Sequence, residues 1–349
     1  MDTKLKTDEV ILPSDLRLRS AQWADLNAVA QLIYTVWEDD GDVTMASTPE
    51  DLTISWQKAG FQLERDTFVI ETVDGRIVGF DQFDNQYRHA ILDAEGYVHP
   101  AFKGRGIGTA LLRAAEKRAH EEMLFAEPDV RMSLRSPINN RDHAAHDLHQ
   151  KEGYHPLRYY WRMEINLTAP PAPAYFPEGI ELRPFGKEQH AQAVLDAQNE
   201  SFRDHWGNHD EEYEQWAARK FGRAAFDPSL WIIAWDGPSG EIAGFSQNRY
   251  RGGIGWIGVL GVRRSWRKRG LGEALLLHSF AEFYQRGMNT IGLGVDSQNP
   301  TGATRLYQKV GMHAVSEFAF YEKELRSGRA ITGRRLAREV VPMLHREAI

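Results

Sequence analysis

Two short stretches combine glycines with a run of cations, a pattern suited to binding phosphate. Residues 267–276 read RKRGLGEALL and residues 103–112 read KGRGIGTALL, and each continues directly into an apolar, helix-like pattern. Glycine leaves successive N–H groups free to point into one space, and the positive end of a following helix favours an anion. Each stretch is therefore a candidate phosphate site. The structural alternative is a plain strand-to-helix turn with a solvated basic rim.

These stretches are landmarks of a repeat that spans most of the chain. Gly108 and Gly272 lie 164 positions apart, and three further pairs of segments recur in the same order at nearly that spacing: Leu18-Arg19 with Leu182-Arg183, IVGF with IAGF, and HQKEGY with YQKVGM. Several matches in one order indicate two copies of one unit. The proline-rich segment TAPPAPAYFPE between them is typical of a stiff linker. We predict an N-terminal domain at 14–167, a linker at 168–179, a C-terminal domain at 180–325, and a basic helix or tail at 326–349.

Composition limits the class of protein. The 349 residues suffice for two domains, and 42% hydrophobic with 26% charged residues is ordinary for a soluble globular chain. No apolar run approaches roughly 18 residues and the polar N-terminus lacks the apolar region of a signal peptide, so we expect no membrane partner. The chain has no cysteine, which excludes disulfides and thiolate chemistry and fits a cytoplasmic location. A net charge of -7 argues against a nucleic-acid partner.

Each unit shows the same succession of predicted elements. A short strand precedes an amphipathic helix, whose apolar face in the first unit lies within residues 26–36. Two strands joined by a turn follow, and a fourth strand runs into the glycine stretch and a long helix. A fifth strand, a last helix and a closing strand after Gly153 or Gly311 complete the unit. This order predicts a mixed α/β fold with an antiparallel start, in which each closing strand completes its own unit.

Other phosphate loops fit the two stretches less well. A Walker loop ends in Gly-Lys followed by Ser or Thr, whereas Gly272 precedes Glu273 and Gly108 precedes Thr109. A dinucleotide fingerprint needs three glycines early in a strand–helix–strand unit, whereas these glycines come past the middle of each unit. The sequence excludes both alternatives.

The second unit resembles the GCN5-related N-acetyltransferase (GNAT) superfamily. RKRGLG at 267–272 is similar to the family's Arg/Gln-x-x-Gly-x-Gly/Ala signature, and DSQNPTGATRLYQKVGM at 296–312 is similar to its Asn-x-x-(Ala/Gly)-x-x-x-Tyr-x-x-x-Gly-Phe/Met segment. The resemblance covers nearly the whole chain as a tandem pair. It implies an α/β fold of two tandem GNAT-like domains, each a mixed, mostly antiparallel sheet flanked by helices and splayed at its centre for coenzyme A.

The resemblance also implies an activity, the transfer of an acetyl group from acetyl-coenzyme A (acetyl-CoA) to an amine without a metal. The glycine loop would hold the pyrophosphate, and the strand before it would face the pantetheine arm and the thioester oxygen. The implied cofactor-binding residues are Leu260, Gly261, Val262, Arg267, Lys268, Arg269, Gly270, Leu271, Gly272 and Asn299 in the second unit, and Val98, Lys103, Gly104, Arg105, Gly106, Ile107 and Gly108 in the first.

The segment before the closing strand supplies the implied catalytic residue. Tyr307 matches the family tyrosine that protonates the departing thiolate, and packing against the sheet is the alternative. Asn299 would cap the last helix or touch the cofactor.

The base for this chemistry is left open by the sequence. An amine attacks only after its ammonium form has lost a proton. The position where the resemblance implies a glutamate is about Trp256, which cannot accept that proton. The remaining candidates are His205, Asp296 and Glu317.

An acidic and aromatic loop lies on the expected acceptor side. Residues 204–216 read DHWGNHDEEYEQW and include Asp204, His205 and Trp206, the implied substrate-binding residues. Such a wall attracts a cationic amine and stacks against its apolar body. A solvated acidic helix start is the alternative.

The first unit is the poorer match to the family. Lys103 replaces the arginine of the signature, His149 stands in the place of the tyrosine, and Glu95 is the only base-like residue in position. His143, His146 and His149 follow at three-residue steps, which spreads them around a helix and favours a polar face over a metal site. We expect this unit to bind coenzyme A weakly or structurally, without turnover.

The sequence therefore predicts an N-acetyltransferase whose second unit acts on the primary amine of a small molecule. An aminoglycoside or a peptide amine is the alternative acceptor. A non-catalytic acyl-CoA sensor is the alternative from another class. The oligomeric state, monomer or homodimer, is left open.

Overall fold

The structure, a computed structural model, describes residues 12–203, 210–299 and 301–329. The first repeat contains β1 (Leu16–Arg19), α1 (Leu26–Asp39), α2 (Pro49–Trp56), α3 (Leu63–Asp66), β2 (Thr67–Thr72), β3 (Ile77–Tyr87), β4 (Ile91–Val98), α4 (Ile107–Glu122), β5 (Met132–Asn139), α5 (His143–Lys151) and β6 (His155–Asn166). The second contains β7 (Ile180–Pro184), α6 (Lys187–Phe202), α7 (Tyr213–Phe221), β8 (Trp231–Asp236), β9 (Ile242–Arg251), β10 (Ile254–Val262), α8 (Leu271–Gln285), β11 (Thr290–Asp296), α9 (Ala303–Lys309) and β12 (His313–Arg326). Nearly the same succession of elements thus occurs twice. Among these elements no helix is both long and apolar enough to span a bilayer.

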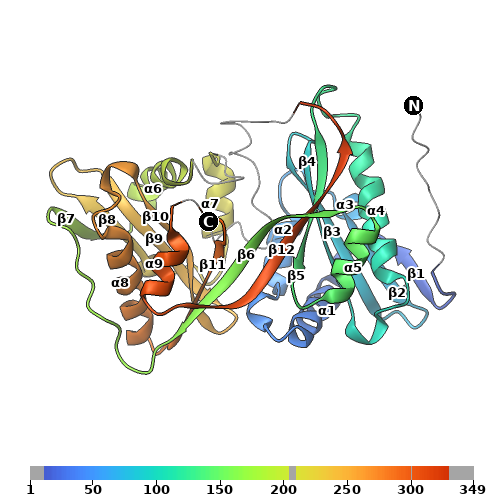
Figure 1. The fold of residues 1–349 in the computed structure, drawn as a ribbon, viewed down its shortest axis with the longest axis horizontal. Helices are drawn as coiled ribbons and strands as arrows, with labels where there is room; N and C mark the ends of the chain where they lie inside the picture. The colour runs from blue at the N-terminus through green and yellow to red at the C-terminus, as the bar shows by residue number, and fades with distance from the viewer. Residues whose placement is uncertain (1–11, 204–209, 300, 330–349) are drawn as a thin grey trace.

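One twelve-stranded sheet runs through the described part of the chain, in the order β1-β2-β3-β4-β5-β12-β6-β11-β10-β9-β8-β7 (Figure 1). Neighbouring strands pair antiparallel, except that β4 with β5 and β10 with β11 pair parallel. This mixed, mostly antiparallel sheet flanked by helices confirms the predicted fold class.

The two repeats exchange their closing strands. β12, from the second repeat, lies between β5 and β6, and β6, from the first repeat, pairs with β11 of the second. Figure 1 shows β6 and β12 running together through the centre of the molecule. The expectation that each closing strand completes its own unit is therefore wrong. A strand's alternation sets which face it buries but does not choose its neighbour, and these strands of 12 and 14 residues are long enough to reach past their own repeat.

Each repeat has a gap at the centre of its half of the sheet. β4 and β5 pair only over 91–93 and 133–135, and β10 and β11 pair only over 255–256 and 291–292. Beyond these residues the parallel strands separate. In β10 the separation coincides with a β-bulge between Ile257 and Val259. Each gap leaves backbone groups of the strand before the glycine loop without a strand neighbour, so a ligand can pair with them.

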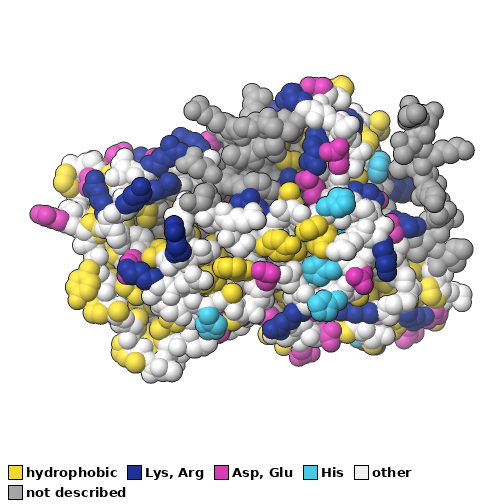
Figure 2. Space-filling view, viewed as in Figure 1, with side chains coloured by type: hydrophobic (Ala, Val, Ile, Leu, Met, Phe, Trp, Pro, Cys, Tyr) yellow, Lys and Arg dark blue, Asp and Glu magenta, His cyan; other side chains and the backbone are white. Residues whose placement is uncertain are grey.

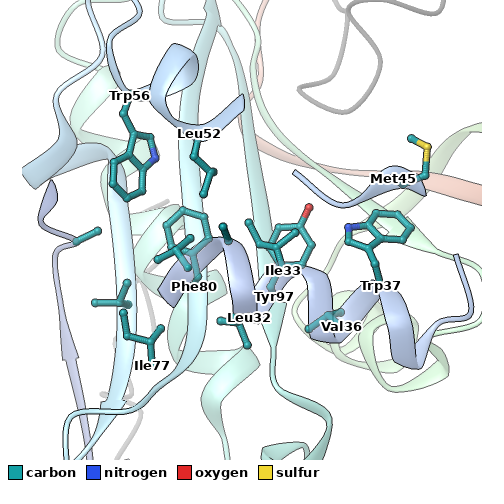
Figure 3. Packing of buried hydrophobic residues seen from close by; sticks show 14 of the residues in the cluster. Leu32, Ile33, Val36, Trp37, Met45, Leu52, Trp56, Ile77, Phe80 and Tyr97 are labelled. Atoms are coloured by element: carbon teal, nitrogen blue, oxygen red, sulfur yellow. The ribbon is translucent and has the colours of Figure 1, made fainter. Parts of the chain in front are cut away.

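Helices cover both faces of the sheet in each repeat. In the first, α1 and α2 pack around Phe80 and Tyr97 (Figure 3), and α4 packs on the opposite face. In the second, α6 and α7 pack on one face and α8 and α9 on the other. The cluster under α1 also includes Trp256 and Phe318 from the second repeat, so the hydrophobic core continues across the junction.

Candidate active sites

Both long helices start from a glycine in the left-handed region. Gly106 (φ 79°) precedes α4 and Gly270 (φ 83°) precedes α8, a conformation that a side chain would strain. The first N–H groups of each helix have no acceptor inside the helix and can bind an anion. A Cβ built on Gly270 would meet no heavy atom within 4 Å, so the space above this loop is open to a ligand. The geometry of both loops therefore fits a pyrophosphate.

The cations of the second loop divide into one that braces the loop and two that are exposed. Arg267 donates from Nε to the Val262 carbonyl at 3.0 Å and from an Nη to the Ser201 carbonyl at 2.7 Å, which ties the loop to β10 and α6. Lys268 and Arg269 are exposed. In Figure 2, Lys and Arg side chains gather at the upper left, over the region of α6 and β8. A phosphate at this loop would meet exposed positive charge.

The cations of the first loop are instead held by carboxylates. Lys103 Nζ lies 3.1 Å from Asp142 at the start of α5, and Arg105 forms an ion pair of 2.8 Å with Asp15. Arg105 also lies over the Phe102 ring, 5.5 Å from its centroid. A phosphate at this loop competes with these carboxylates, so we expect weaker binding of coenzyme A here than at the second loop.

Several predicted cofactor residues shape the loops from beneath. Ile107 and Leu271 are buried under the starts of α4 and α8. Gly108 lets α5 approach closely, since a Cβ there would lie 3.0 Å from the nearest atom of Leu148. At Gly272 a Cβ would lie 3.5 Å from Leu306 of α9, an ordinary contact distance. Gly104, with φ 80°, turns the first loop.

The strand ends before the loops carry the remaining predicted residues. Val98 and Val262 end β4 and β10. Leu260 is partly buried against the apolar residues under α8, and Gly261 lies beneath the Phe245 ring, where a side chain would clash. These residues therefore lie on the strand ends beside the gaps, where the resemblance implies that the backbone faces the cofactor.

Tyr307 and Asn299 lie on and just before α9. Tyr307 is 8% exposed among apolar side chains. A tyrosine hydroxyl is protonated at neutral pH, and burial raises the pKa of this one further above its ordinary value. Asn299 accepts a hydrogen bond from the Thr301 N–H at 2.8 Å, whereas the residue that caps α9 is Gly302. Asn299 therefore forms the turn ahead of the helix, three positions before the residue that caps it, and does not itself cap α9.

The candidates for the base are engaged elsewhere or lie outside the described residues. Asp296 forms an ion pair of 2.6 Å with Arg158, and Glu317 accepts from Trp161 Nε1 at 2.6 Å. His205, like Asp204 and Trp206, belongs to residues 204–209, which the structure does not describe. The rest of the predicted acceptor loop, 210–216, is described and runs into α7, where Glu211 forms an ion pair with Arg219. Most of the C-terminal tail, residues 330–349, lies outside the described residues.

A cavity of about 780 Å³ lies between the two repeats. Its first-repeat wall includes Tyr34 of α1 and Asp51 of α2, and its second-repeat wall includes Gln247 and Arg249 of β9 and Gly258 at the β10 bulge. It reaches the strand that would face the thioester. The sequence reasoning missed this cavity, because its walls come from distant segments that no local pattern relates.

A second cavity, of about 360 Å³, lies in the first repeat, with Phe318 of β12 also in its wall. Gly104 and Gly106 of the loop, Glu95 of β4, Trp37 of α1 and His149 of α5 all line it. The structure brings to this one cavity the predicted residues Val98, Lys103, Gly104, Gly106, Ile107 and Gly108. The glycine loop and Glu95, the base-like residue that the sequence predicted, therefore line one cavity.

Burial alters the charge state of the groups in this cavity. It raises the pKa of Asp40 to about 6, of Glu95 to about 7, and that of Asp81 well above its ordinary value. It lowers the pKa of His149 to about 4, and the Nδ1–H of this neutral ring donates to the Ala145 carbonyl at 2.8 Å. Asp40 and Asp81 are residues that the sequence reasoning missed, since burial of a carboxyl leaves no local signal.

The three histidines of α5 serve different contacts. His143 is exposed, His146 Nδ1 lies 2.9 Å from the Tyr321 hydroxyl, and His149 lines the cavity. Within the described ranges no group of three or more His, Asp or Glu side chains is arranged to hold a metal ion.

Comparison with known proteins identifies the repeated unit. The acetyltransferase (GNAT) family model matches residues 191–312, and an acetyltransferase (GNAT) domain model matches residues 64–156. A mycothiol acetyltransferase of Salinispora arenicola is 30% identical, over 73% of this chain and 80% of its own length. The crystal structure of a GCN5-related N-acetyltransferase from Sphaerobacter thermophilus superposes with a TM-score of 0.77, covering 92% of this chain and 99% of that chain. The two sequences are 33% identical.

The tandem arrangement also has a solved counterpart. A tandem GNAT protein from the clavulanic acid biosynthesis pathway shares the fold, with a TM-score of 0.69, 16% identity, and coverage of 90% of this chain and 100% of that chain. GNAT proteins take their acyl group from an acyl-CoA, which agrees with the two glycine loops. The chain belongs to the GNAT acetyltransferase family, as a tandem acyltransferase that resembles mycothiol synthase.

Proposed function

We propose that the second repeat transfers an acetyl group from acetyl-CoA to the primary amine of a small molecule. The observation that carries this proposal is Tyr307, a buried and protonated tyrosine on the helix that packs beside the loop of Lys268 and Arg269. The first repeat has His149 in the equivalent place, and the one N–H of its neutral ring is already bound to the Ala145 carbonyl.

Residues of the second repeat would have four roles in the reaction: binding the pyrophosphate, binding the pantetheine and thioester, protonating the thiolate, and deprotonating the amine. The N–H groups at the start of α8, with Lys268 and Arg269, would hold the pyrophosphate. The edge of β10 that β11 leaves free beyond Trp256 would pair with the pantetheine amides and donate to the thioester oxygen, where negative charge develops. Tyr307 would then give its proton to the departing thiolate. Because Asp296 and Glu317 are engaged by other side chains, we propose His205 as the base.

The cavity between the repeats is the acceptor site that we propose. It reaches Gly258 on β10, and its walls carry both cationic and anionic side chains together with Tyr34 and Tyr250. Aromatic faces and charged groups of both signs suit a polar amine with an apolar body. The curated relatives are named for mycothiol, a small molecule, which supports a small-molecule acceptor.

A screen of primary amines, read by release of free thiol from acetyl-CoA, tests this proposal. We expect at least one small amine to be acetylated. In parallel, acetyl-CoA should raise the melting temperature, because a ligand that binds only the folded state stabilises it. A normal rise in melting temperature with no amine accepted would indicate a non-catalytic acyl-CoA sensor and contradict the proposal.

A further inference from the structure

Glu95, a buried carboxyl of the first repeat, lies on the face of the sheet from which an acceptor would enter. Glu95 of β4 pairs directly with Gln82 of β3, and Gln82 accepts a hydrogen bond from Trp56 Nε1 of α2 at 3.1 Å. Directly paired residues of antiparallel strands project to the same face of a sheet. Glu95 therefore lies on the face that α1 and α2 cover.

The glycine loop of the first repeat opens on the other face. A Cβ on Gly79 of β3 would lie 2.6 Å from Ile107, the first residue of α4, so α4 covers the face opposite to α1. Yet Gly106 at the start of α4 and Glu95 line one cavity. This cavity therefore passes through the sheet where β4 and β5 separate, and an acyl-CoA arm that enters from the loop would end beside Glu95.

The surroundings of Glu95 allow it to change its charge near neutral pH. Burial raises its pKa to about 7, while a hydrogen bond donated by the Tyr97 hydroxyl and the charge of Arg251 oppose that rise. Asp81 from β3 interacts with it electrostatically, and Asp40 and His149 line the same cavity from α1 and α5. A carboxylate with this pKa is an efficient proton acceptor at neutral pH.

We propose that the first repeat is a second acyl-transfer centre, in which Glu95 removes a proton from a small, cationic primary amine. The ammonium gives one proton to the carboxylate, and the freed amine forms a bond to the thioester carbonyl carbon. The carbon–sulfur bond then breaks with its electron pair on sulfur, and a second proton from nitrogen neutralises the thiolate. Glu95 afterwards releases its proton to solvent. This centre replaces the structural role that the sequence predicts for the repeat, and it does not depend on the activity proposed for the second repeat.

The charges of the cavity select the class of acceptor. Asp40, Asp81 and Glu95 line it, and the cation that lines it, Lys103, is already paired with Asp142. An ammonium group lowers the pKa of such carboxyls and is attracted by their negative charge. A carboxylate on the acceptor would instead be repelled by them. The volume of about 360 Å³ has to hold the acyl end as well. A compact diamine fits these conditions and an amino acid does not.

The equivalent positions of the second repeat lack these groups. Gln247 of β9 pairs with Val259 as Gln82 pairs with Glu95, so a buried valine stands in the place of the carboxylate. By the same pairing, Ser246 stands in the place of Asp81 and Gly261 in that of Tyr97. The carboxylate arrangement thus belongs to the first repeat and is not a consequence of the shared fold.

The test uses the full chain with the second loop disabled by Gly270→Glu. Putrescine and cadaverine are offered as acceptors, glycine and glutamate as their anionic counterparts, and thiol release from acetyl-CoA is followed. We expect a diamine to be acetylated, with a kcat that rises through about pH 7. Adding Glu95→Gln should lower that kcat by roughly 100-fold or more, while Glu64→Gln, an exposed carboxyl on α3, should leave it unchanged.

Binding gives a readout that does not depend on turnover. Calorimetry of the parent chain should count two acetyl-CoA molecules per chain, the Gly270→Glu variant should keep one, and Glu95→Gln should not change the count. The proposal is overturned by a single site in the parent chain, by no diamine acetylation in the Gly270→Glu variant, or by a rate that Glu95→Gln leaves intact. Tyr307→Phe should not affect this diamine activity, so failure here is separable from failure of the function proposed for the second repeat.

Discussion

Tyr307 and His149 occupy equivalent places in the two repeats but differ in the proton that each can deliver. Tyr307 is protonated at neutral pH, as tyrosines ordinarily are, and burial raises the pKa of its hydroxyl further. His149 is neutral, because burial lowers its pKa to about 4, and its only N–H is bound to a backbone carbonyl. At the level of single residues, this difference supports our proposal that leaving-group protonation occurs in the second repeat.

Tyr307→Phe should separate cofactor binding from chemistry. The variant keeps the buried ring and its packing but removes the proton donor, so turnover should fall by roughly 10²- to 10⁴-fold while acetyl-CoA affinity holds. Steady-state kinetics and calorimetry check the two quantities. Tyr160→Phe, a buried tyrosine of β6 away from the loops, is the matched control and should turn over normally. An unchanged rate in Tyr307→Phe would reduce this tyrosine to a packing residue.

Glu95 and Glu322 should affect stability in opposite directions as pH changes. The pKa of Glu95 is raised by burial from about 4.5 to about 7, so between these values the folded state binds more protons than the unfolded state and stability falls as pH rises. Arg131 and Arg135 lower the pKa of Glu322 to about 2 against its burial, so its contribution is present above about pH 4.5 and is lost as pH falls toward 2.

Glu95→Gln should therefore stabilise the chain at pH 8, by up to about 3 kcal/mol, since a shift of one pKa unit is worth about 1.4 kcal/mol. Glu322→Gln should destabilise it by a similar amount at that pH. Denaturant unfolding at pH 5 and pH 8 measures both. A Glu95→Gln variant that is less stable than the parent at pH 8 would show that the carboxylate holds the fold together and is not strained within it.

At the scale of the elements, the exchange of β6 and β12 makes each repeat depend on the other. Phe318 of β12 is fully buried among α1 residues of the first repeat, and Met163 of β6 is fully buried in the core under α8 of the second. Replacing either by alanine should cost about 2–5 kcal/mol of unfolding free energy. The part of the fold that each substitution destabilises is more informative than the size of the loss, because it shows which repeat the side chain supports.

Hydrogen exchange should show that the loosening crosses the repeats. We expect Phe318→Ala to deprotect α1 and β4, and Met163→Ala to deprotect β11 and α8, because packing is lost where the side chain lies. Each variant is the control of the other. Loosening confined to the repeat from which the residue comes in sequence would contradict the exchanged arrangement.

The sequence predicted the elements and the glycine loops but not their partners. Gly106 and Gly270 were recognisable because a left-handed cap before a helix is a local requirement, and the fold class followed from the order of elements. The partner of β12 is set by packing of Phe318 against α1, which no local pattern encodes. The cavity that joins Tyr34 to Gly258, and the burial that alters Glu95, depend in the same way on contacts between distant segments.

At the scale of the whole molecule, the repeats share one loop geometry but keep different reactive groups. The second retains a buried tyrosine and a loop with exposed cations, and the first retains a buried carboxylate and a loop whose cations are paired. Our two proposals therefore give the two copies different acceptors. The main transfer is assigned to the second copy because the loop cations and the proton donor coincide there.

The steady-state rate of Gly270→Glu and Gly106→Glu, with the best acceptor of the amine screen other than a diamine, tests this assignment most directly. Both glycines have φ near 80°, so the backbone strain of the two variants is matched, and circular dichroism must first show that both are folded. A carboxylate in the second loop should repel the pyrophosphate and lower turnover more than 100-fold, whereas in the first loop it should lower turnover by no more than a few-fold. An equal loss of turnover in both variants, or a loss in Gly106→Glu alone, would contradict the assignment of the main transfer to the second repeat.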